Sequence, residues 1–97
     1  MTKIVEVLVT WLGFKAISLP DTFQYITVAK FEEDKRSWEK EAWSVVLEFT
    51  DSPRNQGNPS RGRAKFLVLN APIERLVTGR KFDMYEGKVK VAEVAIL

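Results

Sequence analysis

The chain has 97 residues, a net charge of +2, and neither cysteine nor histidine. These absences exclude disulfides, thiol nucleophiles, imidazole bases and zinc sites built from thiolate or imidazole ligands. The length suits a single domain, residues 1–97, and the small net charge alone gives no argument for a nucleic-acid partner. The N-terminus lacks a signal-peptide core and no apolar run could span a membrane, so we expect a cytoplasmic protein with no membrane partner.

Three segments in the first half alternate between apolar and other residues with the period of two that is typical of β-strands. They are residues 4–11, 23–29 and 43–50. Between the first two, residues 13–21 should form a loop, because Pro20 fixes its own φ and disfavours helix at Leu19. In the first segment one face carries Val5, Val7, Val9 and Trp11.

Residues 30–41, KFEEDKRSWEKE, are mostly good helix formers. Phe31, Trp38 and Ala42 recur near one helical face, which predicts one short helix near residues 31–41. Such a short helix is marginal on its own and no N-cap residue precedes it. A long, charged hairpin connection is therefore the alternative.

Residues 51–63 contain two prolines, two glycines and two asparagines, a composition that predicts a loop. Extended to residue 65, this basic loop (51–65) carries one acidic residue, Asp51, and most of the excess positive charge of the chain. Its basic residues are Arg54, Arg61, Arg63 and Lys65.

Three further strands are expected at residues 65–69, 81–85 and 88–96, with a tight turn at Glu86-Gly87 between the last two. The last strand changes phase near Val91-Ala92, which indicates either a β-bulge or a strand that is apolar on both faces. Six strand-like segments separated by turns predict an all-β fold, a small antiparallel barrel or sandwich.

From Trp43 onward the sequence resembles the C-terminal (third) β-barrel domain of translation elongation factor Tu and small, free-standing bacterial proteins built on that barrel. The ending of that domain, PI…G..F…EGG…G.GV, is matched by Pro72, Ile73, Gly79, Phe82, Glu86 and Gly87. Lys88 replaces the second turn glycine, and the family's GYRP turn after the first strand is absent. The resemblance covers mainly residues 43–97 and implies a six-stranded antiparallel barrel. It does not imply GTP binding, because the chain has no GxxxxGK(S/T) phosphate loop.

No arrangement of residues points to catalysis. The carboxylates near residues 32–41 are surrounded by lysines and an arginine, as on a solvated charged face, and no histidine is present to activate a serine. We therefore expect no enzyme activity, no cofactor and no metal. A carboxylate-based hydrolase is the least favoured function.

Two binding functions remain. The favoured one is a non-enzymatic protein-interaction module of unknown role, with Trp38 as the candidate contact because tryptophan is a frequent hot-spot residue; Trp38 could instead anchor the predicted helix. The alternative is a nucleic-acid-binding module that uses the basic loop, unless that loop only aids solubility. The sequence leaves the partner unidentified, and we expect a monomer or a weak homodimer.

Overall fold

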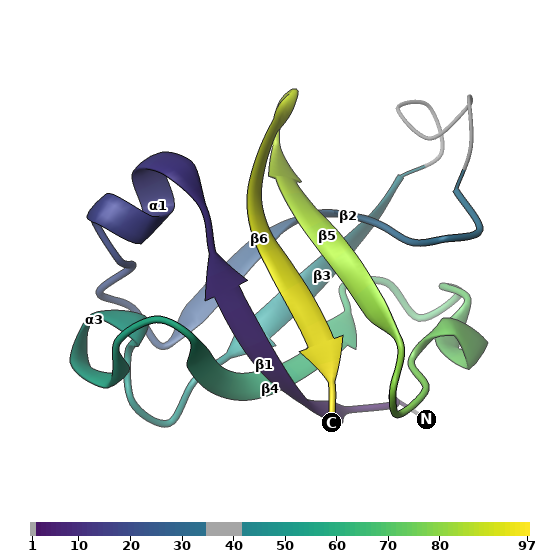
Figure 1. Cartoon of the computed structure of the whole chain (residues 1–97). Coiled ribbons are helices and arrows are strands. Elements are labelled where there is room, and N and C mark those ends of the chain that lie inside the picture. The colour runs from purple at the N-terminus through teal and green to yellow at the C-terminus, as the bar shows by residue number, and fades with distance from the viewer. Residues whose placement is uncertain (1, 35–41) are drawn as a thin grey trace.

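The computed structural model describes residues 2–34 and 42–97, and over these residues six strands form a closed antiparallel barrel (Figure 1). Their order around the barrel is β1-β4-β3-β2-β5-β6, which confirms the predicted all-β barrel. The strands are β1 (Val5–Trp11), β2 (Gln24–Lys30), β3 (Trp43–Glu48), β4 (Ser60–Phe66), β5 (Lys81–Glu86) and β6 (Val89–Ile96). No helix in the described part of the chain could cross a membrane.

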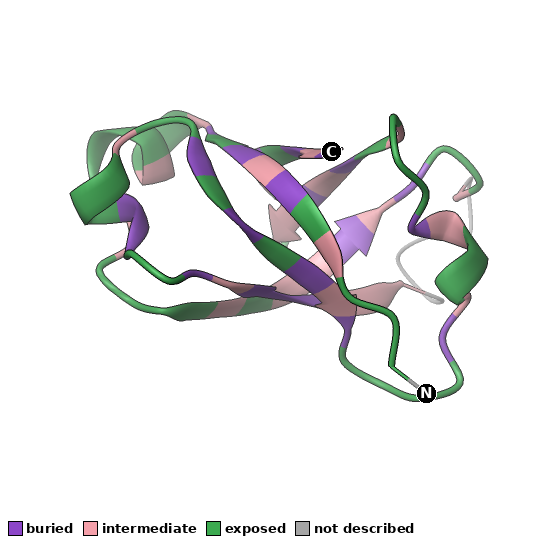
Figure 2. Ribbon diagram, turned by 90° about the horizontal axis from the view of Figure 1, so that it is seen from below, coloured by how far each residue is buried: buried purple, intermediate pink, exposed green. Residues whose placement is uncertain are grey.

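The strands bury one face and expose the other, so buried and exposed residues alternate along the ribbons (Figure 2). On β1, Val7, Val9 and Trp11 are buried, as the alternation predicts. The indole of Trp11 packs edge-on against Tyr25, with 5.3 Å between ring centroids, and its Nε1 donates a hydrogen bond to the buried Oγ of Ser60 at 3.1 Å. These contacts fill one end of the barrel.

The phase change in β6 is a β-bulge. Met84 pairs with Ala92, but the next residue of β5, Tyr85, pairs with Lys90, so Val91 is the extra residue. Both Val91 and Ala92 are buried. This confirms the first of the two predicted interpretations, and a bulge here suits the bending that a closed sheet requires.

Two predictions about the connections are wrong. The segment 13–21 is not wholly a loop, because it contains α1 (Gly13–Ile17). The strand predicted at residues 65–69 instead ends at Phe66, since β3 begins at Trp43 and the residues after 67 have no strand beside them. A short 3-10 helix, η1 (Ile73–Arg75), follows this segment.

The helix predicted near residues 31–41 falls mostly outside the described residues, as does Trp38. Of this segment only residues 31–34 are described. They form a turn in which the N–H of Asp34 donates to the carbonyl of Phe31 at 3.0 Å. Phe31 is buried and stacks on Phe82 with 4.7 Å between ring centroids, so it fills the barrel interior.

Candidate functional site

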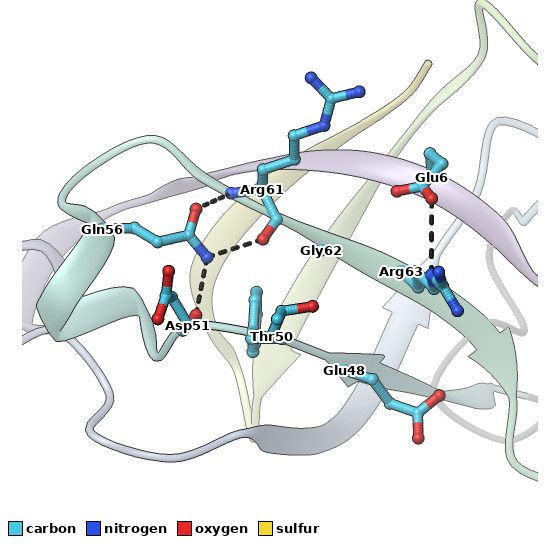
Figure 3. Close-up of a pocket in the computed structure, with 9 residues that line it drawn as sticks. Glu6, Glu48, Thr50, Asp51, Gln56, Arg61, Gly62 and Arg63 are labelled. Atoms are coloured by element: carbon cyan, nitrogen blue, oxygen red, sulfur yellow. Dashed lines mark hydrogen bonds and ion pairs between the residues drawn. The ribbon is translucent and has the colours of Figure 1, made fainter.

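A groove lies where β3 separates from β4. The two strands pair from Val45–Phe66 to Glu48–Arg63, after which residues 49–51 turn away and Arg61 has no partner on β3. The groove has a volume of about 500 Å³ (Figure 3). Its lining comes from β1, β3, β4 and the segment between β3 and β4: Glu6, Glu48, Phe49, Thr50, Asp51, Gln56, Arg61, Gly62 and Arg63.

The side-chain amide of Gln56 fills the place that β3 leaves (Figure 3). Its Oε1 accepts from the N–H of Arg61 at 2.7 Å, and its Nε2 donates to the carbonyls of Arg61 at 2.8 Å and Asp51 at 2.7 Å. Gln56 is the last residue of α3 (Pro53–Gln56). The helix begins at Pro53, a residue favoured at the first helical position, and the side chain of Ser52 caps its N-terminus. The amide thereby fixes one wall of the groove.

The floor of the groove is Gly62, which approaches its neighbours too closely for any side chain. A Cβ at this position would lie 2.6 Å from the carbonyl oxygen of Glu48 and 2.7 Å from the ring of Phe49. Phe49 is itself buried and packs against Trp11 with 6.2 Å between centroids. The absent side chain therefore lets the Phe49 ring lie against β4.

Charged groups of both signs line the groove. The lining includes three carboxylates, from Glu6, Glu48 and Asp51, and two guanidinium groups, from Arg61 and Arg63, a net charge of −1. Arg63 pairs with Glu6 at 3.4 Å. Among the residues that the structure describes, the side chains of Asp51 and Arg61 make no ion pair. Within residues 2–34 and 42–97, Asp51 and Arg61 thus have no ion-pair partner and are available to a ligand.

The residues predicted to bind nucleic acid do not lie together on a loop. Arg61, Arg63 and Lys65 alternate along the outward face of β4. The prediction that residues 51–63 form a loop is therefore wrong at α3 and from Ser60 onward. Lys65 pairs with Glu48 at 3.6 Å. Arg54 is on α3 instead, where its guanidinium pairs with Asp21 at 3.5 Å.

A weak signal for β4 was present in the sequence. Basic side chains alternate there with the small residues Ser60, Gly62 and Ala64, which all face the barrel interior and are buried. Strands are recognised by apolar residues at every second position, and small residues such as serine and glycine do not stand out as apolar in such a pattern. The prolines and glycines nearby therefore dominated the prediction.

Two acidic residues before the undescribed segment 35–41, Glu33 and Asp34, are engaged in ion pairs. Glu33 accepts from Arg80 at 2.7 Å, and this hydrogen bond lowers the pKa of Glu33 to about 2. Asp34 pairs with Arg75 at 3.1 Å. Within residues 2–34 and 42–97 no three acidic side chains gather as a metal site would require. The absence of enzyme activity stays a prediction.

Sequence reasoning missed a polar cluster at the end of the β5–β6 hairpin. The hydroxyl of Tyr25 donates to the carboxylate of Glu86, which also lies 3.1 Å from the ammonium of Lys15. Burial, and then the bond to Glu86, raise the pKa of Tyr25, whereas the tyrosine hydrogen bond lowers the pKa of Glu86. These residues are far apart in sequence, so no local pattern could reveal them. The cluster ties α1 and β2 to the hairpin.

Of the residues that resemble the elongation factor domain, Phe82 and Glu86 lie on β5 and the others lie at connections. Pro72 and Ile73 begin η1, and Gly79 and Gly87 have positive φ values of +91° and +61° at two turns. No family model, curated protein or solved structure matches the chain. The six-stranded barrel thus stands on the structure itself.

Proposed function

We propose that this protein is a non-enzymatic protein-interaction module and that the groove between β3 and β4 is a contact site. The observation that carries the proposal is the mixed charge of the groove. A protein surface offers both carboxylates and ammonium or guanidinium groups, so it can complement such a lining. A nucleic-acid backbone offers only negative charge, which complements Arg61 but not Asp51.

The two unpaired groups suggest how a partner would be held. The guanidinium of Arg61 can donate two parallel hydrogen bonds to a carboxylate. Asp51 can accept from a lysine or arginine of the partner. Because Gln56 fixes the backbone at both residues, little conformational entropy is lost when the partner binds.

Kinship with the third domain of elongation factor Tu is part of the proposal. It is supported by the turn residues Pro72, Gly79 and Gly87 and by the six-stranded barrel. The resemblance implies a docking role without GTP binding. Trp38 stays a predicted second contact.

Nucleic-acid binding is the second candidate function, on the strength of one observation. Arg61, Arg63 and Lys65 occupy alternate positions on the outward face of β4, roughly 6.6 Å apart along the strand, and could follow a phosphate chain. Arg63 and Lys65 would have to leave their ion pairs, which at exposed sites costs only about 0–1 kcal/mol each.

A photo-crosslinking amino acid at Thr50 tests the favoured function in extracts of the organism that encodes the protein. We expect a discrete protein adduct that disappears in Arg61→Glu and persists in the control Lys88→Glu, which changes the same charge at the exposed β5–β6 turn. No adduct, or an adduct insensitive to Arg61→Glu, would contradict the proposal.

A titration of labelled RNA and DNA oligonucleotides at low salt separates the two functions. The proposal expects no binding. Binding that weakens with salt and is lost in the Arg61→Ala, Arg63→Ala double variant would establish the nucleic-acid function instead.

A further inference from the structure

The edge of β2 that faces β5 is open over half of its length. β2 pairs with β3 from Gln24 to Ala29, but with β5 only from Val28 to Lys30. In Figure 1 the chain of β2 begins at the lower left, whereas the tip of the β5–β6 hairpin rises to the top. Residues 24–27, which we call the open edge, therefore have a strand on one side only.

The direction of the backbone groups along β2 follows from one hydrogen bond. The N–H of Phe49 donates to the carbonyl of Phe23 at 2.8 Å. Alternate residues of an antiparallel strand direct their N–H and carbonyl to opposite neighbours, so the odd-numbered residues of β2 bond to β3. The backbone groups of Gln24, Ile26 and Val28 therefore point away from β3.

These three residues differ in what meets their backbone groups. Val28 pairs with Tyr85 of β5. The N–H of Gln24 donates to Oγ1 of Thr22 at 3.3 Å, and this hydroxyl donates to the carbonyl of Gln24 at 3.1 Å, so one side chain covers both groups. Among the residues that the structure describes, neither the N–H nor the carbonyl of Ile26 has a partner. An unpaired N–H and carbonyl at a strand edge form a template for another strand.

The side chains beside the open edge set the chemistry of a strand that is added there. On the outer face, Ile26 is 46% exposed and lies opposite the buried Val46. On the inner face, the hydroxyl of Tyr25 donates to Glu86, which pairs with Lys15. An added strand therefore meets an apolar row on its outer face and polar groups on its inner face.

We propose that the open edge binds an extended segment of a partner protein as an additional antiparallel strand. The segment residue opposite Ile26 exchanges two backbone hydrogen bonds with it, since an extended polypeptide presents an N–H and a carbonyl at the spacing of this pair. That residue is apolar and packs on Ile26, and its neighbours are polar. Where the segment continues to Gln24, it replaces the hydroxyl of Thr22. This site is separate from the groove, which lies beyond β3.

The pairing pattern excludes the same edge of a second copy as the occupant. Two β2 strands paired antiparallel at Ile26 place Gln24 of one copy opposite Val28 of the other, where Tyr85 already lies. A single segment avoids this conflict because it can begin opposite residue 27 and extend towards Gln24. The occupant is therefore a short strand that enters beside the hairpin.

An NMR titration of the isotope-labelled full chain with the peptide acetyl-Thr-Val-Thr-Lys-amide tests the proposal, the valine being the residue opposite Ile26. We expect the Ile26 amide resonance to move downfield with a dissociation constant on the order of 1 mM, as suits so few bonds. Hydrogen exchange of this amide should slow, because its N–H gains an acceptor. The amide of Thr27, which faces β3, is the internal reference and should change little.

The matched control is the same peptide with its valine N-methylated, which keeps every side chain but lacks the N–H that donates to the carbonyl of Ile26. It should bind about tenfold more weakly or worse. N-methylation of the second threonine, whose N–H points away from β2, should have little effect. The groove variant Arg61→Glu should bind the peptide like the wild-type protein, so failure of the open edge and failure of the groove are told apart.

Two results would overturn the proposal: an Ile26 resonance that does not move at roughly 10 mM peptide, or equal binding of the peptide with N-methylated valine. A shift of the Ile26 resonance with protein concentration alone would place a second copy at the open edge and would overturn it equally.

Discussion

The side-chain amide of Asn58 pairs with both backbone groups of Trp11, accepting from its N–H at 2.9 Å and donating to its carbonyl at 3.0 Å. The β1–β4 ladder ends at the pair Val9–Ser60, two residues earlier. Asn58 thus replaces a strand neighbour for Trp11, as Gln56 does for Arg61. Both amides satisfy backbone groups where the barrel has no strand to offer, at a part-buried position for Trp11 and at an exposed one for Arg61.

Replacing Asn58 by Ala should lower the free energy of unfolding by about 1–3 kcal/mol, because the N–H and carbonyl of Trp11 lose their partners in a partly buried place. Urea denaturation measures the change. Asn70→Ala is the control, since Asn70 is exposed and makes no side-chain hydrogen bond among the described residues. Equal stability of the two variants would contradict the role of Asn58.

Gln56→Ala should act locally, at Arg61. Its N–H loses the acceptor at 2.7 Å, so amide hydrogen exchange at this residue should accelerate about tenfold or more, as expected for a lost bond worth about 1.4 kcal/mol. The amide of Phe49, which donates to the carbonyl of Phe23 at 2.8 Å, is the internal reference and should change little. Unchanged exchange at Arg61 would show that water replaces the glutamine without cost.

Gly62→Ala should destabilise the barrel by about 1–3 kcal/mol, because the new methyl group meets the Glu48 carbonyl and the buried Phe49 ring. The ring would have to move, and its contact with Trp11 with it. Thermal unfolding measures the effect. The neighbouring Arg61→Ala, which removes an exposed side chain, should stay within about 0.5 kcal/mol of the wild-type protein.

The ion pair between Glu33 and Arg80 should contribute stability that depends on pH. The pKa of Glu33 in the folded protein is about 2, below its ordinary value of 4.5. The contribution is therefore complete above about pH 4.5 and is lost as the pH falls towards 2. It should not exceed about 1 kcal/mol, since the Glu33 side chain is 40% exposed.

Urea denaturation at pH 6 and pH 2 checks this sign. Glu33→Gln should be less stable than the wild-type protein at pH 6 and equal to it at pH 2. Glu74→Gln removes an exposed carboxylate that has no ion pair in the described part of the chain, and should follow the wild-type protein. A constant difference between Glu33→Gln and wild type would show that the charge of Glu33 is not the cause.

The phenol of Tyr25 should stay protonated at a pH where free tyrosine, with a pKa of about 10, ionises. Burial and the bond to the Glu86 carboxylate both raise its pKa. The chain has two tyrosines, so the absorbance change of the folded protein up to about pH 11 should be the same in wild type and Tyr25→Phe. In urea the variant should lose half of the change. If the folded variant showed a smaller absorbance change than the folded wild-type protein, the Tyr25 hydroxyl would be exposed to water and would ionise like free tyrosine.

Local chemistry in the sequence determined the strand faces. Val7, Val9 and Trp11 alternate with less buried residues, and a shift of the pairing register by one residue would move all three out of the core. For the last strand the sequence left two interpretations, a β-bulge or a strand apolar on both faces, and the one-residue shift of the ladder at the buried residues Val91 and Ala92 decides for the bulge. Five of the six strands in the described part of the chain, all but β4, and the Glu86-Gly87 turn were therefore predictable to within a few residues at their ends.

Only the tertiary structure decided the start of β4 and the groove beside it. Ser60 and Gly62 are small because the rings of Trp11 and Phe49 occupy the space beside them. No pattern among neighbouring residues in the sequence reflects this requirement, and the composition of the segment is that of a loop. The groove combines charges from β1, β3 and β4, which are neighbours because β4 pairs with both of the others. Pairing across so many residues depends on how the whole core packs, and a local pattern cannot encode it.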